Sequence, residues 1–333
     1  MATLPLSAFK IHEKSNINLY QLIFYCLQKL IRFQKHFRKM ADKHAYLILA
    51  HANPGQLRTL LGMLDDSEND IYIHIDGKSK FGYEVLDGVC KQSEVHCIEP
   101  RIAVSWGGVS IIDVEMALLE EAVKTPHSYY HLLSGMDLPI KSQKHIHDFF
   151  AANSGKEFLN LWTLPYHTLW RVQYYTLFPE GTHFFLTNWL NHAFKWILRK
   201  LGLKRNADVE FRQGSQWFSI THELACYIVS EKEWVHKVFC RSCICDEIFI
   251  PTLVWRSSFK DRLYCSEETE DHCVNLSNMR FILWDRGGSI RHPWTFRISD
   301  YDLLMSVPHL WARKFDERVD KEIIDKVASE IGK

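Results

Sequence analysis

The sequence of 333 residues lacks an excess of charge of either sign, because 40 lysines and arginines balance 40 aspartates and glutamates. A chain that coats nucleic acid needs a strongly basic balance, so we expect no nucleic-acid partner. The sequence also lacks internal repeats and a phosphate-binding loop of the G-x-x-x-x-G-K type. What is left is an ordinary globular composition, with 47% hydrophobic residues.

Long apolar runs are missing as well. Residues 17–40 place apolar side chains at helical spacing before a basic tail, but the run is shorter and more polar than the ~20 apolar residues of a membrane span. No cleavable signal peptide precedes it. We expect residues 1–43 to form an accessory amphipathic helix that packs on the main domain or lies on an anionic membrane. Residues 188–205 are amphipathic too, as a core helix or as a flap facing membrane or acceptor.

The cysteines lack a second regular pair. Their number is nine, an odd count, so at least one thiol has no partner within the chain. Cys240, Cys243 and Cys245 are closely spaced, with His272 and Cys273 downstream as candidate ligands. A structural zinc site usually takes two ligand pairs at regular spacing, and the second half here is irregular. We therefore predict no metal site, and interpret the cysteines as buried thiols in a reducing compartment.

Strands and helices alternate from residue 44 onward. Short apolar runs typical of buried strands lie at 45–51, 71–76, 94–98 and 129–133. Helices are expected after the turn at 53–55, around 80–92, and after 106–110. This alternation predicts an α/β fold with a central, mostly parallel sheet flanked by helices. We expect one main domain over 44–318 and a C-terminal helix over 319–333.

Polar side chains end two of the predicted strands. His51 ends the first and Asp76 follows the second. Because the carboxyl ends of parallel strands meet at one edge, these two residues are candidates for a shared ligand crevice. Asp137, just beyond "LLSG", is a candidate substrate contact. Each is alternatively an ordinary turn former.

Two glycine-containing blocks are candidate substrate contacts. In "WGGVS", Trp106 and Gly107 precede a predicted helix, whose free N–H groups can meet an anion. In "GSQWF", Ser215 precedes Trp217 on a predicted strand. Tryptophan faces are platforms for sugar rings, although a tryptophan in the core is the alternative reading.

An acidic pair, Asp246 and Glu247, stands directly behind the cysteines. Apolar residues follow at helical spacing, so we expect Glu247 to begin a helix. A carboxylate there is favoured by the helix dipole and the free N–H groups, which alone explains its presence. A carboxylate on an aromatic-rich wall can also serve as a general base.

Cations gather in the last third of the chain, where they can hold a diphosphate or form a solvated charged face. They are Arg286, Arg291, Arg297, Arg313 and Lys314. The spacing of Asp300 and Asp302 occurs in metal sites, but a serine before two acids at a helix start is typical of capping, which we prefer.

Taken in order, these blocks resemble glycosyltransferase family 14, which includes core-2/I-branching β-1,6-N-acetylglucosaminyltransferases and peptide O-xylosyltransferases. The resemblance runs from about residue 44 to 318, and its most specific parts are "IHIDGKS", "WGGVS" and "SGMDLPI". "WGGVS" is closer to the xylosyltransferases, and "ARKFD" is closer to the branching enzymes.

The resemblance implies a GT-A type fold and an inverting transfer without a metal cofactor. The implied donor is a UDP-sugar, with N-acetylglucosamine ahead of xylose, and the acceptor is a hydroxyl of a glycan, glycolipid or glycoprotein. By this similarity Asp76 contacts uracil at a nucleotide site that includes His51, and Glu247 is the base. Lys314 holds the diphosphate with Arg291 as its partner, a role for which Arg286 and Arg297 compete.

A missing anchor and disulfide framework favour a bacterial-type member at the cytoplasmic face, peripheral on the inner membrane (or on the Golgi membrane in a eukaryote). Two other functions stay open. One is a carbohydrate-binding protein that kept the fold and lost catalysis. The other is a metal-dependent transferase or hydrolase that uses the cysteines or the pair Asp300 and Asp302.

Overall fold

The chain divides at Ala41 into two units, Met1–Ala41 and Asp42–Lys333. The computed structural model describes residues 42–265, 276–284 and 293–332, all within the second unit. The helix predicted within 17–40 therefore lies outside the described residues. In the described part, no helix is long and apolar enough to cross a membrane.

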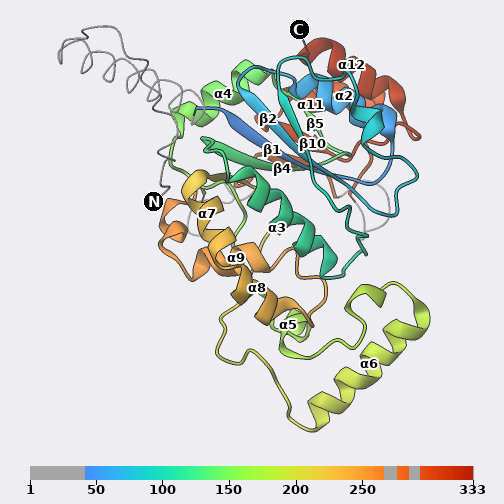
Figure 1. Ribbon diagram of the computed structural model, residues 1–333, viewed down its shortest axis with the longest axis vertical. Coiled ribbons are helices and arrows are strands. Elements are labelled where there is room, and N and C mark those ends of the chain that lie inside the picture. Colours follow the sequence, from blue (N-terminus) through green and yellow to red (C-terminus); the bar gives the residue numbers. More distant parts are fainter. Residues whose placement is uncertain (1–41, 266–275, 285–292, 333) are drawn as a thin grey trace, which may run out of the picture. The chain divides into compact units, whose positions relative to one another are not determined.

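A five-stranded sheet forms the centre of the second unit (Figure 1). Its order is β3-β2-β1-β4-β8, and only β8 runs antiparallel to its neighbour. The strands are β1 (His44–Ala50), β2 (Asn69–Ile75), β3 (Glu94–Cys97), β4 (Tyr129–Ser134) and β8 (Ser219–Thr221). The predicted α/β class with a mostly parallel sheet is confirmed.

Helices cover both faces of this sheet, and each face has its own apolar core. Leu47 of β1 belongs to the cluster beneath α3, α7, α8 and α9, while its neighbour Ile48 belongs to the cluster beneath α2, α4 and α12. Successive strand residues point to opposite faces, so a strand covered on both sides reads as a continuous apolar run. These helices are α2 (Pro54–Leu64), α3 (Ser110–Ala122), α4 (Gln143–Ala152), α7 (His222–Ser230), α8 (Lys232–Phe239), α9 (Phe249–Trp255) and α12 (Lys321–Ile331).

A three-stranded sheet packs beside the central one, in the order β5-β10-β9. Its strands are β5 (Leu138–Pro139), β10 (Trp311–Arg313) and β9 (Arg280–Ile282). Arg280 is buried and donates hydrogen bonds to the carbonyls of Leu132 and Phe218. These contacts join β9 to β4 and to the residue before β8. Burial lowers the pKa of the Arg280 guanidinium to about 9.

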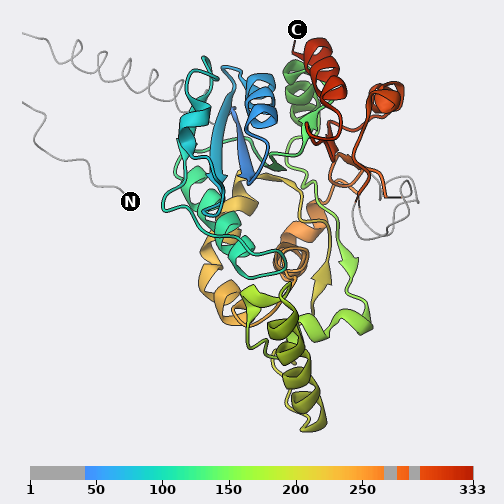
Figure 2. The same ribbon diagram turned by 90° about the vertical axis from the view of Figure 1, so that its right-hand side faces the viewer.

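A further group of elements lies at one end of the unit, away from the helices α2 and α12 (Figures 1 and 2). They include α5 (Trp170–Gln173), α6 (Phe185–Lys200) and the two-stranded sheet of β6 (Trp162–Thr163) and β7 (Arg212–Gln213). The short helix α11 (Tyr301–Ser306) precedes β10.

Two local predictions are wrong. The helix expected around 80–92 is only a 3₁₀ turn over Tyr83–Leu86, in a segment that contains Gly82 and Gly88. The strand expected to carry Trp217 begins two residues later, at Ser219.

A substitution at Gly77, in the turn after β2, tests how tightly this edge of the sheet is packed. A Cβ atom there would lie 2.9 Å from the backbone oxygen of Arg101, whereas a Cβ at Gly62 in α2 would meet nothing within 4 Å. We expect Gly77→Ala to lower the free energy of unfolding by about 1–3 kcal/mol. The matched control Gly62→Ala should raise it by about 0.5–1 kcal/mol, because Gly is unfavourable inside a helix. Urea denaturation measures both, and equal effects would contradict this description of the turn.

Candidate functional site

The carboxyl ends of β1, β2 and β4 meet at one edge of the sheet. The amide of Asp76 donates to the carbonyl of Ala50 at 2.8 Å, and the amide of Gly135 donates to that of Leu49 at 2.8 Å. His51 and Asp76 therefore emerge side by side, with Asp137 shortly after the end of β4. The predicted common edge is present.

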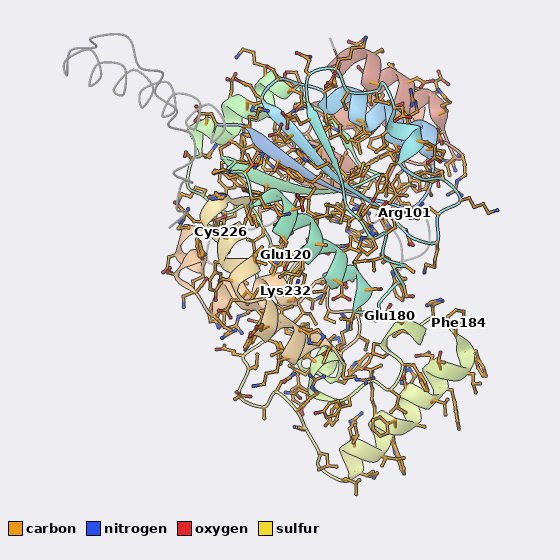
Figure 3. All side chains as sticks on the ribbon, in the orientation of Figure 1. Arg101, Glu120, Glu180, Phe184, Cys226 and Lys232 are labelled. Atoms are coloured by element: carbon orange, nitrogen blue, oxygen red, sulfur yellow. The ribbon has the colours of Figure 1, made fainter. Side chains whose placement is uncertain are left out.

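The turn that holds Asp76 is fixed from two sides. Its Oδ1 accepts hydrogen bonds from the amides of Lys78, at 2.8 Å, and Val104, at 3.3 Å. Arg101, labelled in Figure 3, donates to the carbonyls of Asp76 and Ser79. Arg101 was missed from the sequence because its partners are backbone atoms.

The side chain of Arg313 is largely covered and packs against Trp217 and Asp137. Its guanidinium lies 3.9 Å from the centroid of the Trp217 ring, and Nη1 lies 3.3 Å from Asp137 Oδ1. Asp137 has no exposed surface, and its other oxygen accepts from the Ser134 amide at 2.9 Å. Burial raises the pKa of Asp137, and the neighbouring Arg313 opposes this. In this arrangement Asp137 positions Arg313. The predicted contacts of substrate with Asp137 and with the face of Trp217 would require these side chains to move, because Arg313 covers both.

Lys314, the next residue, is different because its ammonium group is only partly buried and has no side-chain partner among the described residues. The pKa of His51 reflects these neighbours. Loss of solvent around the ring lowers it most, the positive charge of Lys314 lowers it further, and the negative charge of Asp76 raises it. Charged groups that act on His51 thus lie close together at this edge of the sheet: Asp76, Arg313 and Lys314. A flexible primary ammonium group without a partner is a ready site for phosphate oxygens.

Glu247 lies in the turn before α9 rather than at the start of a helix, since α9 begins at Phe249. Its side chain is 41% exposed. Oε2 accepts a hydrogen bond from Gln213 Nε2 at 3.2 Å, and the Glu247 carbonyl accepts from the Gly214 amide at 2.8 Å. Loss of solvent raises the pKa of Glu247, while Arg171, at 3.8 Å, lowers it. The same loop, 213–217, carries Trp217 and thereby connects Glu247 with Arg313.

Two further carboxyl groups lie near Glu247. Asp246 has a pKa raised to about 6, first by burial and then by the adjacent Glu247. Glu115, in the middle of α3, has no exposed surface, and its Oε1 accepts from Gln216 Nε2 at 2.8 Å. Its Oε2 has no hydrogen-bond partner among the described residues, and burial raises its pKa well above the ordinary value. Through Gln216, Glu115 anchors the loop 213–217 to α3.

The start of α3 is occupied by a carboxylate of the chain itself. Glu180 accepts from the amides of Val109, at 2.7 Å, and Ser110, at 2.9 Å, and lies at the lower end of α3 (Figure 3). The expectation of free N–H groups for a ligand anion at this helix start is therefore wrong.

Gly107 has a φ of +71°, and its carbonyl accepts from the amide of Ile244 at 2.9 Å. This contact places Trp106, which is 70% exposed, beside the segment that leads to Glu247.

The described residues do not gather the cysteines into a metal site. Their one cluster with metal-ligand geometry is Asp66, Glu68 and His147, which lies near the start of β2, at the opposite edge of the sheet. Cys243 accepts a hydrogen bond from Lys195, and burial raises the pKa of the Cys245 thiol well above its ordinary value.

The remaining predicted residues are Arg286, Arg291, Arg297, Asp300 and Ser215. Arg286 and Arg291 lie outside the described residues. Arg297 is exposed and lies over the ring of Trp294, 5.6 Å from its centroid. Asp300 accepts hydrogen bonds from the Trp294 indole and the Arg297 amide, which confirms the predicted cap. Ser215 accepts from the Trp217 amide within the loop 213–217.

Comparison with known proteins identifies the family of the chain. The sequence profile of the Core-2/I-Branching enzyme family matches residues 44–304. The chain belongs to this family of glycosyltransferases. Among its relatives, "Xylosyltransferase 2" of Rattus norvegicus is 24% identical over 307 residues, which are 84% of this chain and 33% of that protein. The "N-acetyllactosaminide beta-1,6-N-acetylglucosaminyl-transferase" of Homo sapiens is 23% identical over 296 residues, 82% of this chain and 68% of that protein.

The chain thus spans about a third of the length of the xylosyltransferase relatives it matches. Among solved structures, the apo form of mouse xyloside xylosyltransferase 1 is similar with a TM-score of 0.28 and 10% identity, covering 63% of this chain and 80% of that one.

The carboxyl groups around Glu247 predict a pH-dependent stability. Because the pKa of Asp246 is raised to about 6 in the folded protein, the folded state keeps a proton that the unfolded chain releases near pH 4. The contribution of Asp246 to stability is therefore full below about pH 4 and is lost as the pH rises through 6. In Asp246→Asn, chemical denaturation should show a weaker fall of the free energy of unfolding over this range, by on the order of 2 kcal/mol. Parallel curves for the two proteins would contradict the shift.

Proposed function

We propose that this chain transfers a sugar, N-acetylglucosamine or next xylose, from a UDP-sugar to a hydroxyl group of a glycan or glycoconjugate, with inversion and without a metal ion. The observation that carries the proposal is the meeting of His51, Asp76 and Lys314 at the carboxyl edge of the sheet. Ligands of open α/β sheets bind at this edge. The relatives named as xylosyl- and N-acetylglucosaminyltransferases supply the two candidate sugars.

In this proposal the nucleotide half of the site is the turn after β2 and the end of β10. Asp76 is held by the Lys78 and Val104 amides through Oδ1, which fixes the carboxylate for contact with the uracil. Lys314 binds the diphosphate, because its ammonium group has no competing side-chain partner among the described residues. Arg313 is committed to Asp137 and Trp217, so it supports Lys314 mainly through its charge.

The transfer needs one base and one stabilised leaving group. The acceptor oxygen attacks the anomeric carbon and gives its proton to Glu247, while the bond between that carbon and the phosphate oxygen breaks on the opposite face. The raised pKa of Glu247 makes its carboxylate a stronger base toward a hydroxyl group. Gln213 and Arg171 orient this carboxylate from the protein side and leave part of it exposed to an acceptor.

The departing UDP gains negative charge, which preorganised cations stabilise by roughly 3–4 kcal/mol each in sites of this kind. In this proposal Lys314, next to Arg313 in the chain, provides such charge without a metal ion. This assignment is supported by the sequence, in which Asp76 is followed by Gly77 and Lys78 rather than by a second carboxylate.

The role of Glu247 predicts a separation of binding from chemistry. Glu247→Gln should keep the affinity for UDP, because the nucleotide contacts lie elsewhere, and should lower transfer about 10²–10⁴-fold. Calorimetry with UDP and an assay of UDP release in the presence of acceptor hydroxyls measure the two quantities. The exposed Glu210, changed to Gln, is a matched control that should retain both. Full transfer by Glu247→Gln would exclude it as the base.

The role of Lys314 predicts a loss of both UDP binding and turnover. Lys314→Ala should weaken UDP binding about tenfold or more, since it removes a charge-assisted contact to the diphosphate, and should lower turnover as well. Lys321→Ala is the control, because Lys321 pairs with Asp325 on α12 and is exposed. If calorimetry gives Lys314→Ala the affinity of the unchanged protein, the diphosphate binds elsewhere.

A further inference from the structure

Helix α6 buries two polar residues together with Leu198, while most of its aromatic residues face solvent. Asn191 and Lys195 are 2% and 6% exposed, whereas Phe185, Trp189 and Trp196 are 89%, 60% and 62% exposed. With about 3.6 residues per turn, these two sets lie on opposite sides of the helix. A surface helix normally buries its apolar side, so this reversal indicates an apolar partner outside the chain.

Specific contacts fix this orientation. Asn191 accepts from the Phe178 amide at 2.9 Å and donates to the Phe178 carbonyl at 3.0 Å. The Lys195 ammonium lies 3.2 Å from Cys243 Sγ and 4.4 Å from the centroid of the Trp170 ring. A rotation of α6 that buried its aromatic rings would break all of these contacts and expose two groups that are now satisfied.

The charge around α6 has one sign. Residues 181–207 contain five lysines and arginines and no aspartate or glutamate. Four of these lie in the last turn of α6 and just after it, and Arg199, Lys200 and Lys204 are exposed. Exposed aromatic rings combined with long cationic side chains match the boundary between acyl chains and anionic headgroups, where lysine and arginine stems bury and their heads stay in water.

We propose that α6 is a membrane-docking helix, and that its outer face binds the surface of an anionic phospholipid membrane. The outer face of α6 consists of Phe185, Leu186, Trp189, Trp196 and Ile197. The helix lies at one end of the unit, beyond α5, with Phe184 at its beginning (Figures 1 and 3). Charge decides between the candidate occupants: a second copy of this basic segment would be repelled, whereas anionic lipid is attracted.

Docking through α6 bears on the site, because the contact of Lys195 with Cys243 ties the helix to the segment that leads to Glu247. Thr182, just before α6, donates to the Trp106 carbonyl at 2.9 Å. A docked α6 therefore holds Trp106 and Glu247 in a fixed relation to the lipid surface. The docking goes beyond the proposed transfer and does not depend on it.

Vesicle flotation with the full chain tests the docking. We expect binding to vesicles of phosphatidylcholine with phosphatidylglycerol, and weaker binding to phosphatidylcholine alone. Trp189→Ser with Trp196→Ser should weaken binding about tenfold or more, and neutralising Arg199, Lys200 and Lys204 to Gln should do the same in a salt-dependent manner. These residues are exposed, so the variants should fold, which circular dichroism checks.

Because residues 17–40 are a second candidate for lipid binding by their sequence, a second readout is confined to α6. Brominated phosphatidylcholine in the same vesicles should quench tryptophan fluorescence in the unchanged chain, and the double tryptophan variant should lose that part of the quenching. Trp284→Ser, at a site 53% exposed after β9, is the matched control and should keep it. Equal quenching in the unchanged chain and the double variant, or no binding to anionic vesicles, would overturn the proposal. Loss of a dimer in the double variant with vesicle binding intact would overturn it as well, in favour of contact between copies.

Discussion

The double pairing of β1 is the constraint on which the candidate site depends. β1 lies between β2 and β4 and is parallel to both, so the residues that follow all three strands emerge at one edge. Apolar cores on both faces hold this register, because a slip of one residue would exchange the side chains of the two cores. His51 and Asp76 meet at this edge as a direct consequence.

The charged side chains of the candidate site differ in how far they are exposed to solvent. Asp137 is buried and its charge is compensated by Arg313, whereas the neighbouring Lys314 has no side-chain partner among the described residues. On the other side, Asp246 and Glu115 are withdrawn from solvent while Glu247 keeps part of its carboxylate exposed. In the proposed transfer, Lys314 on one side is the cation for the diphosphate, and Glu247 on the other side is the carboxylate for the acceptor. The loop 213–217 connects the halves, since it contacts Glu247 at one end and Arg313 at the other.

The sequence predicted those features that depend on local pattern. Continuous apolar runs marked β1, β2 and β4, and the polar residues after them marked the ligand edge. The family resemblance added the roles of Asp76, Glu247 and Lys314, which no local spacing contains. The helix expected around 80–92 was wrong because weak periodicity there could not outweigh its glycines.

Contacts between distant segments could not be predicted in this way. Glu180 caps α3 across 70 residues of sequence, and Glu115 reaches Gln216 across 101. Neither residue belongs to a motif, and only the fold brings each to its partner. The reversed polarity of α6 was visible as an amphipathic pattern, but which face is buried depends on Phe178, Trp170 and Cys243.

The central claim is a nucleotide site whose charge comes from the chain itself. It is tested most directly by calorimetric titration of UDP into the unchanged protein, once in excess EDTA and once with manganese. The account predicts binding in EDTA with an affinity close to that measured with manganese. Binding that requires manganese would contradict it, because the diphosphate would then depend on a metal ion rather than on Lys314.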